Sequence, residues 1–285
     1  MKTITPTIPQ LRMLASIRGK QWLVMESQLP AFALAALDAT GPREGISISM
    51  EDCFELRPES TIDGEGIATI HIHATLIDSC PPIYEKLGLV TRYETIQGEI
   101  KSAMESGAKG ILFIVDSPGG TVSGNVECAD FIASLPLPTV AFCKGLACSA
   151  AYKISAGCGY IIASQSATVG NIGTILSWAD CSEMWKEMGI EFKAITSEGA
   201  DLKSTFHLEP NADQLAFLQE EINRAGEQFR QHVIAGRGAA GATLDDEIWR
   251  AGWYSGERAG MLGLIDDIGT EDDAREVLIG MMQVI

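Results

Sequence analysis

Apolar and polar positions alternate with two different periods from about residue 64 onward. Residues 67–77 (IATIHIHATLI) place apolar side chains at every second position and are rich in β-branched residues, which predicts a strand. Residues 93–106 carry Ile96, Ile100 and Met104 at helical spacing, which predicts an amphipathic helix. Residues 110–115 are almost wholly apolar, a pattern typical of a strand buried on both faces of a parallel sheet.

The same succession of strands and helices continues to the C-terminus. Further strands are expected at residues 139–143, 160–163, 173–176, 192–196 and 264–268. Helices are expected at residues 122–135, 149–156 and 211–230, with one more at the C-terminus. Repeated β-α-β units with right-handed crossovers predict a layered α/β fold.

The first 58 residues follow a different pattern. They contain five prolines, a helix-like stretch at 28–37 and an acidic turn at 50–55. We therefore expect an N-terminal arm or small appendage at 1–58 and a core domain at 59–285. Residues 1–21 lack the apolar stretch of a signal peptide, and no apolar run approaches the ~20 residues that span a bilayer.

Charge and cysteine content narrow the function classes. The chain of 285 residues has 38 Asp and Glu against 21 Lys and Arg, a formal charge of −17. This acidity disfavours a nucleic-acid binder and a polybasic membrane-surface protein. Seven cysteines without a C-x-x-C pair favour reduced thiols over a disulfide framework. We expect a cytoplasmic protein that neither binds nucleic acid nor inserts into a membrane.

Residues 116–120 (DSPGG) form the first junction with possible chemistry. They end a buried strand and begin a helix, and paired glycines allow backbone N–H groups to turn outward beside the helix N-terminus. Such a cradle binds an anion, either a phosphate or the oxyanion of a tetrahedral intermediate. Pro-Gly-Gly is also common in plain turns, so both interpretations stay open.

Ser149 marks the second junction, at the start of a helix made mostly of small residues. Small neighbours allow another backbone to approach, and the N–H of Ala150 is placed to stabilise charge beside the Ser149 hydroxyl. The competing interpretation is a helix N-cap, a role that serine fills very often and that is favoured when this motif is taken alone.

A nucleophilic serine needs a base. The four histidines are expected to be surface or hydrogen-bonded core residues, and His71 and His73 have no third metal ligand nearby in the sequence; the others are His207 and His232. No metal site is therefore expected.

A lysine base is the alternative, and it requires the neutral amine. Its ordinary pKa of ~10.4 must then fall by roughly 3 units through burial away from carboxylates. Lys153 follows Ser149 by one helical turn, and Lys203 lies in a loop after the 192–196 strand. Each is also compatible with a solvated surface lysine, and spacing does not choose between them.

Six short motifs in one order resemble a known family. They are residues 91–93 (TRY), 110–120 (GILFIVDSPGG), 147–152 (ACSAAY), 168–173 (TVGNIG), 202–204 (LKS) and 253–269 (from WYSG to GLIDDIG). Residues 70–270 thus resemble the signal peptide peptidase A/protease IV family of Ser–Lys serine peptidases, which share the Clp-protease/crotonase fold. Residues 128–132 (CADFI) and 19–24 (GKQWLV) are most similar to the phage branch of head-maturation proteases, the minor capsid protein C type.

The resemblance implies roles for individual residues. Ser149 matches the nucleophile and Lys203 the general base, which leaves Lys153 as the second candidate. The N–H groups of Gly120 and Ala150 match the oxyanion hole. Asn171 stands where the family often has a serine that hydrogen-bonds the catalytic lysine, and its side-chain oxygen is able to accept from an amine.

The implied activity is peptide-bond hydrolysis through an acyl-enzyme, without a cofactor. The implied substrate is an extended polypeptide, a capsid or scaffold protein among them, and the implied assembly is a homo-oligomer. Two alternatives stay open: a crotonase-type acyl-CoA enzyme, and a capsid or scaffold protein of the same fold with an idle dyad.

Overall fold

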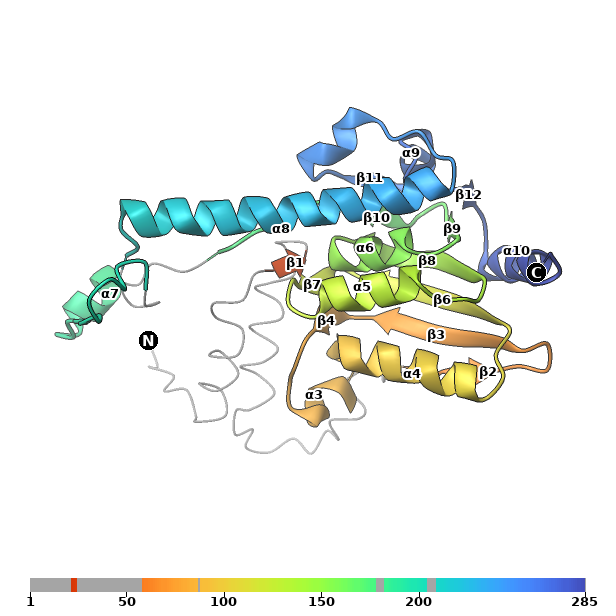
Figure 1. Ribbon diagram of the computed structural model, residues 1–285, viewed down its shortest axis with the longest axis horizontal. Helices are drawn as coiled ribbons and strands as arrows, with labels where there is room; N and C mark the ends of the chain where they lie inside the picture. Colours follow the sequence, from red (N-terminus) through yellow and green to blue (C-terminus); the bar gives the residue numbers. More distant parts are fainter. Residues whose placement is uncertain (1–21, 25–57, 87, 178–181, 204–208, 285) are drawn as a thin grey trace, which may run out of the picture.

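The computed structural model describes residues 22–24, 58–86, 88–177, 182–203 and 209–284 (Figure 1). The helix expected at 28–37 and the acidic turn at 50–55 lie outside these residues. The division of the chain at residue 58 stays a prediction.

The described strands and helices alternate along the core as the sequence pattern predicts. The strands are β1 (Trp22–Val24), β2 (Thr61–Ile62), β3 (Ile67–His73), β4 (Thr75–Ile77), β5 (Val90–Arg92), β6 (Gly110–Ser117), β7 (Gly119–Thr121), β8 (Thr139–Cys148), β9 (Tyr160–Ala163), β10 (Thr168–Gly170), β11 (Trp253–Ser255) and β12 (Asp267–Ile268). The helices are α3 (Pro82–Lys86), α4 (Tyr93–Glu105), α5 (Asn125–Ala133), α6 (Ala150–Ala156), α7 (Ser182–Glu187), α8 (Ala212–Ala239), α9 (Gly256–Met261), α10 (Glu271–Met282) and a 3-10 turn, η2 (Asp246–Arg250).

The larger sheet has the order β11-β10-β8-β6-β3-β2, and β9 and β12 continue beside the first half of β8. Its central ladders, β3–β6 and β6–β8, are parallel. The apolar run in β6 is buried on both faces: Phe113 and Val115 join one hydrophobic cluster, and Leu112 and Ile114 join the other. This confirms the prediction of a doubly covered parallel strand.

A smaller sheet has the order β1-β7-β4-β5. The expected strand at 67–77 divides between the two sheets, because Ala74 has a positive φ of 56° that turns the chain out of β3 and into β4. The pattern therefore predicted the extended conformation correctly and was wrong about one continuous strand.

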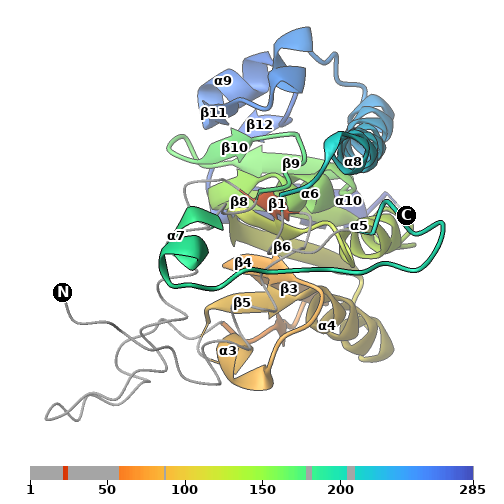
Figure 2. The same cartoon turned by 90° about the vertical axis from the view of Figure 1, so that its left-hand side faces the viewer.

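Helices cover both faces of the larger sheet (Figures 1 and 2). On one face lie α4, α5 and α6, with α8 packed over α6. On the other face α10 packs against β6 and β8 through Ala274 and Leu278. The layered α/β fold is confirmed.

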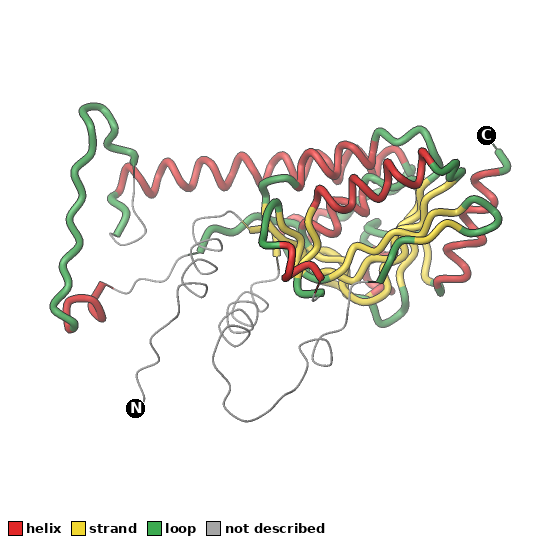
Figure 3. The backbone as a smooth tube through the Cα atoms, turned by 90° about the horizontal axis from the view of Figure 1, so that it is seen from below, coloured by secondary structure: helices red, strands yellow, loops and turns green. Residues whose placement is uncertain are grey.

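The two ends of α8 have different surroundings (Figure 3). Near its C-terminal end, Phe229 and Val233 are fully buried, and Gly236 allows close packing because a Cβ there would lie 1.8 Å from the Ala156 carbonyl oxygen. Its N-terminal half extends past the sheets, and there Leu215 and Phe217 are 40% and 41% exposed. An Asn211 capping box begins the helix, which runs nine residues beyond the predicted end at residue 230.

Arg237 anchors the C-terminal end of α8 through hydrogen bonds. Its buried guanidinium makes two hydrogen bonds to the Asp266 carboxylate, at 2.8 and 3.0 Å, and donates a third to the Gly263 carbonyl. Asp266 also accepts from the backbone N–H of Ile161 at the start of β9. This network joins α8 to the far edge of the larger sheet.

Two of the expected strands are absent from the described residues. Residues 192–196 form an exposed extended loop after α7, and residues 173–176 contain one isolated bridge residue, Ile175. In the described part of the chain, the 192–196 loop has no strand beside it to complete a ladder, so its apolar alternation does not produce one.

The cysteines in the core agree with the expectation of reduced thiols. Cys128, Cys143, Cys148 and Cys158 are buried and form no disulfide. Burial raises the pKa of Cys128, Cys148 and Cys158 to about 12, so these thiols are protonated at neutral pH. None of the described helices is both long enough and apolar enough to cross a membrane.

Asp266→Asn leaves the Arg237 guanidinium buried without its counter-charge. We expect the free energy of unfolding, measured by urea titration, to fall by about 3 kcal/mol or more. The control is Glu247→Gln, which breaks the solvent-exposed ion pair with Arg258 and should cost less than about 1 kcal/mol. Equal losses in the two variants would contradict this account of α8 anchoring.

Candidate active site

The parallel pairing of β6 with β8 brings the two candidate junctions to the same edge of the sheet. The ladder continues to the pair Ser117–Ala147, with an irregularity after Val115. Beyond this pair, β6 turns into β7 and β8 turns into α6. Figure 1 shows β7 beside α6, and the two elements are in contact. The residues predicted to form an oxyanion hole and a nucleophile therefore lie at neighbouring turns.

Ser149 occupies a strained turn between β8 and α6. Its φ is 55° and its ψ is −118°, a conformation that non-glycine residues rarely adopt. Backbone hydrogen bonds hold it: the Ser149 N–H donates to the Gly170 carbonyl at 2.8 Å, and the Ser149 carbonyl accepts from the Lys153 N–H at 2.9 Å. A sharp strand-to-helix turn of this kind presents the nucleophilic serine of the α/β-hydrolases.

The Ser149 side chain does not cap the helix. Although Ser149 stands at the N-cap position of α6, its hydroxyl makes no capping hydrogen bond. The residue is 1% exposed, and its Oγ has no hydrogen-bond partner among the described residues. A buried, unpaired hydroxyl carries a free-energy cost that a helix cap would have avoided. The arrangement fits a reactive group better than a structural one.

Gly120 lies in β7, which packs against α6. A Cβ at this position would lie 1.8 Å from the Leu76 carbonyl oxygen, so close approach of β4 requires glycine whatever else the residue does. Gly119 has a positive φ of 106°, and its N–H donates to the Ser117 hydroxyl. The structure thus brings Gly120 and Ala150 to the same edge as Ser149.

Asn125 was not singled out from the sequence. It begins α5, and its side-chain nitrogen donates to the Ala150 carbonyl at 3.1 Å, which ties the start of α5 to the start of α6. The signal available in the sequence was an amide side chain directly after Gly124, near the start of the predicted helix. Because fully buried Asn125 hydrogen-bonds the residue that follows Ser149, it acts as a positioning residue for the Ser149 turn.

Asn171 also lies beside the serine. It follows Gly170, whose carbonyl accepts the Ser149 N–H. Its backbone N–H donates to the Gly252 carbonyl at 2.7 Å and its side-chain nitrogen donates to the Ala251 carbonyl at 3.0 Å. The side-chain oxygen is the polar atom that remains to accept from an amine.

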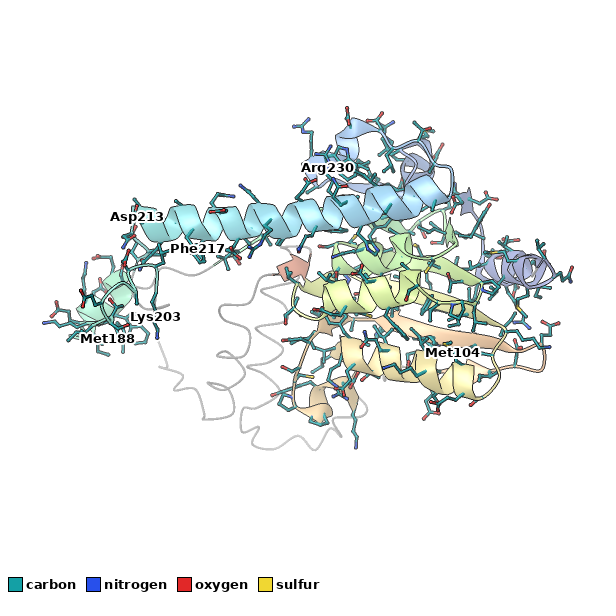
Figure 4. The ribbon with its side chains drawn as sticks, viewed as in Figure 1. Met104, Met188, Lys203, Asp213, Phe217 and Arg230 are labelled. Atoms are coloured by element: carbon teal, nitrogen blue, oxygen red, sulfur yellow. The ribbon has the colours of Figure 1, made fainter. Side chains whose placement is uncertain are left out.

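Lys203 is not brought to Ser149 within the chain. It is exposed in the loop between α7 and α8, and its carbonyl accepts a hydrogen bond from Gln214 in the first turn of α8. The helix reaches the α6 region only near Phe229, fifteen residues or roughly 22 Å further along its axis. Figure 4 shows Lys203 at the outer end of α8.

Lys153 is buried, being 2% exposed, and lies against α8. Its Nζ is 5.9 Å from the centroid of the Phe229 ring. Burial lowers the pKa of the Lys153 ammonium, and the Asp130 and Glu127 carboxylates oppose this effect. It makes no hydrogen bond to the Ser149 hydroxyl. The structure thus places neither lysine's amine within hydrogen-bonding distance of the Ser149 hydroxyl.

The histidines do not join this site. His232 on α8 lies with its Nδ1 3.2 Å from an Asp130 carboxylate oxygen, and burial lowers its pKa. His71 and His73 lie on β3, and His207 is outside the described residues. Within the described ranges, no three His, Cys, Asp or Glu side chains are grouped closely enough to hold a metal ion.

Comparison with protein families decides the membership of the chain. The model of Peptidase family S49 matches residues 134–284, which is more than half of the sequence and includes Ser149 and Lys203. The chain belongs to peptidase family S49. A Clp protease model matches residues 94–167, which agrees with the parallel sheet and its helices.

Several curated proteins are similar to this S49 chain. A putative protease of Methanocaldococcus jannaschii is 33% identical over 178 residues, which cover 61% of the chain and 56% of the relative. A putative signal peptide peptidase SppA of Enterococcus faecium is 33% identical over 190 residues, covering 63% and 53%. The capsid assembly protease C of Escherichia phage lambda is 26% identical over 260 residues, covering 90% and 55%. The resemblance inferred from the motifs is confirmed.

The S49 chain spans little more than half the length of these three relatives. Among solved structures, a lysine-to-alanine variant of the 1510-N membrane-bound stomatin-specific protease, in complex with a substrate peptide, aligns with a TM-score of 0.43 and 15% identity. The alignment covers 73% of this chain and 77% of that one.

Ser149→Gly should be more stable than Ser149→Ala, because glycine adopts a positive φ without a Cβ penalty. We expect a difference of about 1 kcal/mol, or about 2–4 °C in Tm, measured by thermal unfolding. At Ser155, inside α6, the order should reverse, with alanine more stable than glycine. The same order at both positions would contradict strain at Ser149.

Lys153→Met removes a charge from an apolar contact and keeps the length of the side chain. We expect the unfolding free energy to rise by ~1 kcal/mol and any peptidase activity of the protein to be retained. Lys144→Met, at an exposed site in β8, should change stability by less than about 0.5 kcal/mol. Loss of hydrolysis in Lys153→Met alone would assign the base to Lys153.

Proposed function

We propose that this chain is a serine endopeptidase with Ser149 as its nucleophile. The observation that carries the proposal is the buried Ser149 Oγ, unpaired at a turn with a φ of 55° between β8 and α6. The neighbouring N–H groups of Gly120 and Ala150 supply the donors that acyl transfer needs. Membership of a peptidase family supports the same reaction class.

In the proposed reaction, the Ser149 oxygen attacks the carbonyl carbon of the scissile peptide bond and its proton passes to the Lys203 amine. The negative charge on the carbonyl oxygen is stabilised by the N–H groups of Gly120 and Ala150. Lys203 then returns the proton to the leaving amine, which gives an acyl-enzyme on Ser149. Water hydrolyses this ester and regenerates the hydroxyl.

A second copy of the chain must bring Lys203 to Ser149 in this proposal. We use the term arm, from here on and distinct from the N-terminal segment 1–58, for residues 182–203 together with residues 212–224 of α8. The arm extends past the sheets (Figure 4), and Gln214 of α8 donates hydrogen bonds to the Asp201 and Lys203 carbonyls. Its exposed apolar side chains are Met188, Ile190, Ile195, Leu202, Leu215 and Phe217. We propose that these exposed side chains on a projecting segment contact the second copy.

Docking of the arm would also change the surroundings of Lys203. In the isolated chain this lysine is exposed to water at the outer end of α8. Docking would bury it beside Ser149 of the other copy, where the Asn171 side-chain oxygen would orient the amine. The base would thus become competent only in the assembled protein.

The proposed substrates are polypeptides, and capsid or scaffold proteins of a phage are the first candidates. The supporting observation is the capsid assembly protease C of phage lambda, whose similarity extends over 90% of this chain. We further propose that the protein acts in the cytoplasm of the host cell.

Mixing two inactive variants tests both the dyad and the assembly. Full-length Ser149→Ala and Lys203→Ala chains, each inactive alone, should recover casein hydrolysis when they are mixed before assembly. Random mixing in a closed ring forms about one quarter of intact sites, so roughly a quarter of the wild-type rate is expected. Lys193→Ala, at another exposed lysine of the arm, is the matched control and should keep full activity.

Three other outcomes of these activity assays would each contradict a different part of the proposal. Inactive mixtures of well-assembled chains would place both members of the dyad in one copy. Full hydrolysis by Ser149→Ala would overturn the peptidase mechanism altogether. Hydrolysis of an acyl-CoA thioester without any peptide cleavage would favour the crotonase-type alternative.

A further inference from the structure

The β7 strand carries a neighbour on each side. β4 pairs with it in parallel at Leu76–Gly120, and β1 pairs with it antiparallel over three residues. The register of the second ladder is Trp22–Thr121, Leu23–Gly120 and Val24–Gly119. Among the described strands β1 pairs with β7 alone, so it is the outer strand of the smaller sheet.

This edge lies next to the nucleophile. β7 contains Gly120, packs against α6 and follows the turn that adjoins the Ser149 turn. Figures 1 and 2 both place β1 beside the first turn of α6. Without β1, the outer edge of β7 would present unpaired backbone groups beside Ser149. Such an edge accepts an extended peptide by strand addition.

The contact between β1 and β7 is short and depends on main-chain groups. Two of the three β7 residues are glycines, so cross-strand side-chain pairs cannot strengthen it. A three-residue ladder is weak by itself. However, β1 and β7 belong to the same chain, so their pairing is intramolecular and is not lost on dilution. A weak ligand held in this way occupies its site and still exchanges.

We propose that residues Trp22–Val24 are a built-in competitor for the peptide site along β7. This inference rests on the proposed function, since it takes the β7 edge to be the edge that binds substrate. The competitor is an extended, uncharged, apolar peptide, and a substrate segment of the same character displaces it. With the edge occupied most of the time, the apparent affinity for substrate equals the intrinsic affinity multiplied by the small fraction of molecules in which the edge is open.

The test measures peptide binding in the inactive Ser149→Ala protein, so it does not need catalysis. The probe is a fluorescently labelled peptide with the sequence of residues 19–27 (GKQWLVMES). Full-length Ser149→Ala/Leu23→Pro is compared with Ser149→Ala/Leu23→Val by fluorescence anisotropy. Proline removes a backbone donor and restricts the strand, whereas valine preserves it. We expect the proline variant to bind the probe on the order of tenfold more tightly.

Hydrogen exchange of Ser149→Ala provides a measurement that does not depend on the proline variant. The amides of residues 22–24 should exchange slowly in the protein alone and faster when the unlabelled peptide saturates it. Equal probe affinities in two folded variants, or exchange that the peptide leaves unchanged, would overturn the proposal. So would cleavage within residues 22–24 by the wild-type protein, detected by mass spectrometry, since the segment would then be a substrate.

A separate measurement, peptide hydrolysis by the wild-type protein, tests the proposed function. If wild-type protein does not hydrolyse peptides while the affinity difference and the exchange effect are observed, β1 covers a peptide-binding edge in a protein without peptidase activity. If hydrolysis is observed and both binding results are negative, the peptidase stands and β1 is a fixed strand of the smaller sheet.

Discussion

The parallel pairing of β6 with β8 determines where the rest of the structure can lie. Because the two strands run in the same direction, their carboxyl ends meet at one edge, and the turns that follow, to β7 and to α6, become neighbours. Both strands are buried on both faces, so helices must cover each side of the sheet. The helix that connects them, α5, then supplies Asn125, which fixes the start of α6. A single ladder thereby places the Ser149 turn and the Gly120 turn together and stiffens both.

The anchoring of α8 is the second constraint, and it explains why Lys203 is remote. Gly236 and the Arg237–Asp266 pair fix the C-terminal end of this helix against α6 and the sheet edge. A continuous helix transmits that direction to its other end, so the arm is held away from the sheets by geometry, and not by a loose connection. On the proposed function, Lys203 therefore reaches a serine only when a second copy of the chain docks against the arm.

The sequence predicts features that depend on a few neighbouring residues, but not features that depend on packing between distant parts of the chain. The buried strand in β6, the helix α4 and the serine at the start of α6 follow from period and composition, which act over a few residues. The break between β3 and β4 depends on the positive φ of one residue, Ala74, which no periodicity reveals. The need for glycine at position 120 comes from Leu76 on another strand. The motif around Lys203 predicted its role as the base. Its distance from Ser149, however, depends on the direction of α8, which is set by packing.

On the proposed function, the isolated chain has a correctly oriented nucleophile, Ser149, but no base beside it. The strained Ser149 conformation persists because backbone hydrogen bonds to Gly170 and Lys153 hold it on both sides, so the hydroxyl stays oriented without a base beside it. On the two proposals above, such a site would avoid hydrolysis of bystander chains in two independent ways. The base would arrive only when a second copy docks, and the peptide edge would open only when β1 is displaced. The first condition depends on the concentration of the protein and the second on the concentration of a suitable substrate segment. Activity would therefore be confined to places where both concentrations are high, as inside an assembling particle.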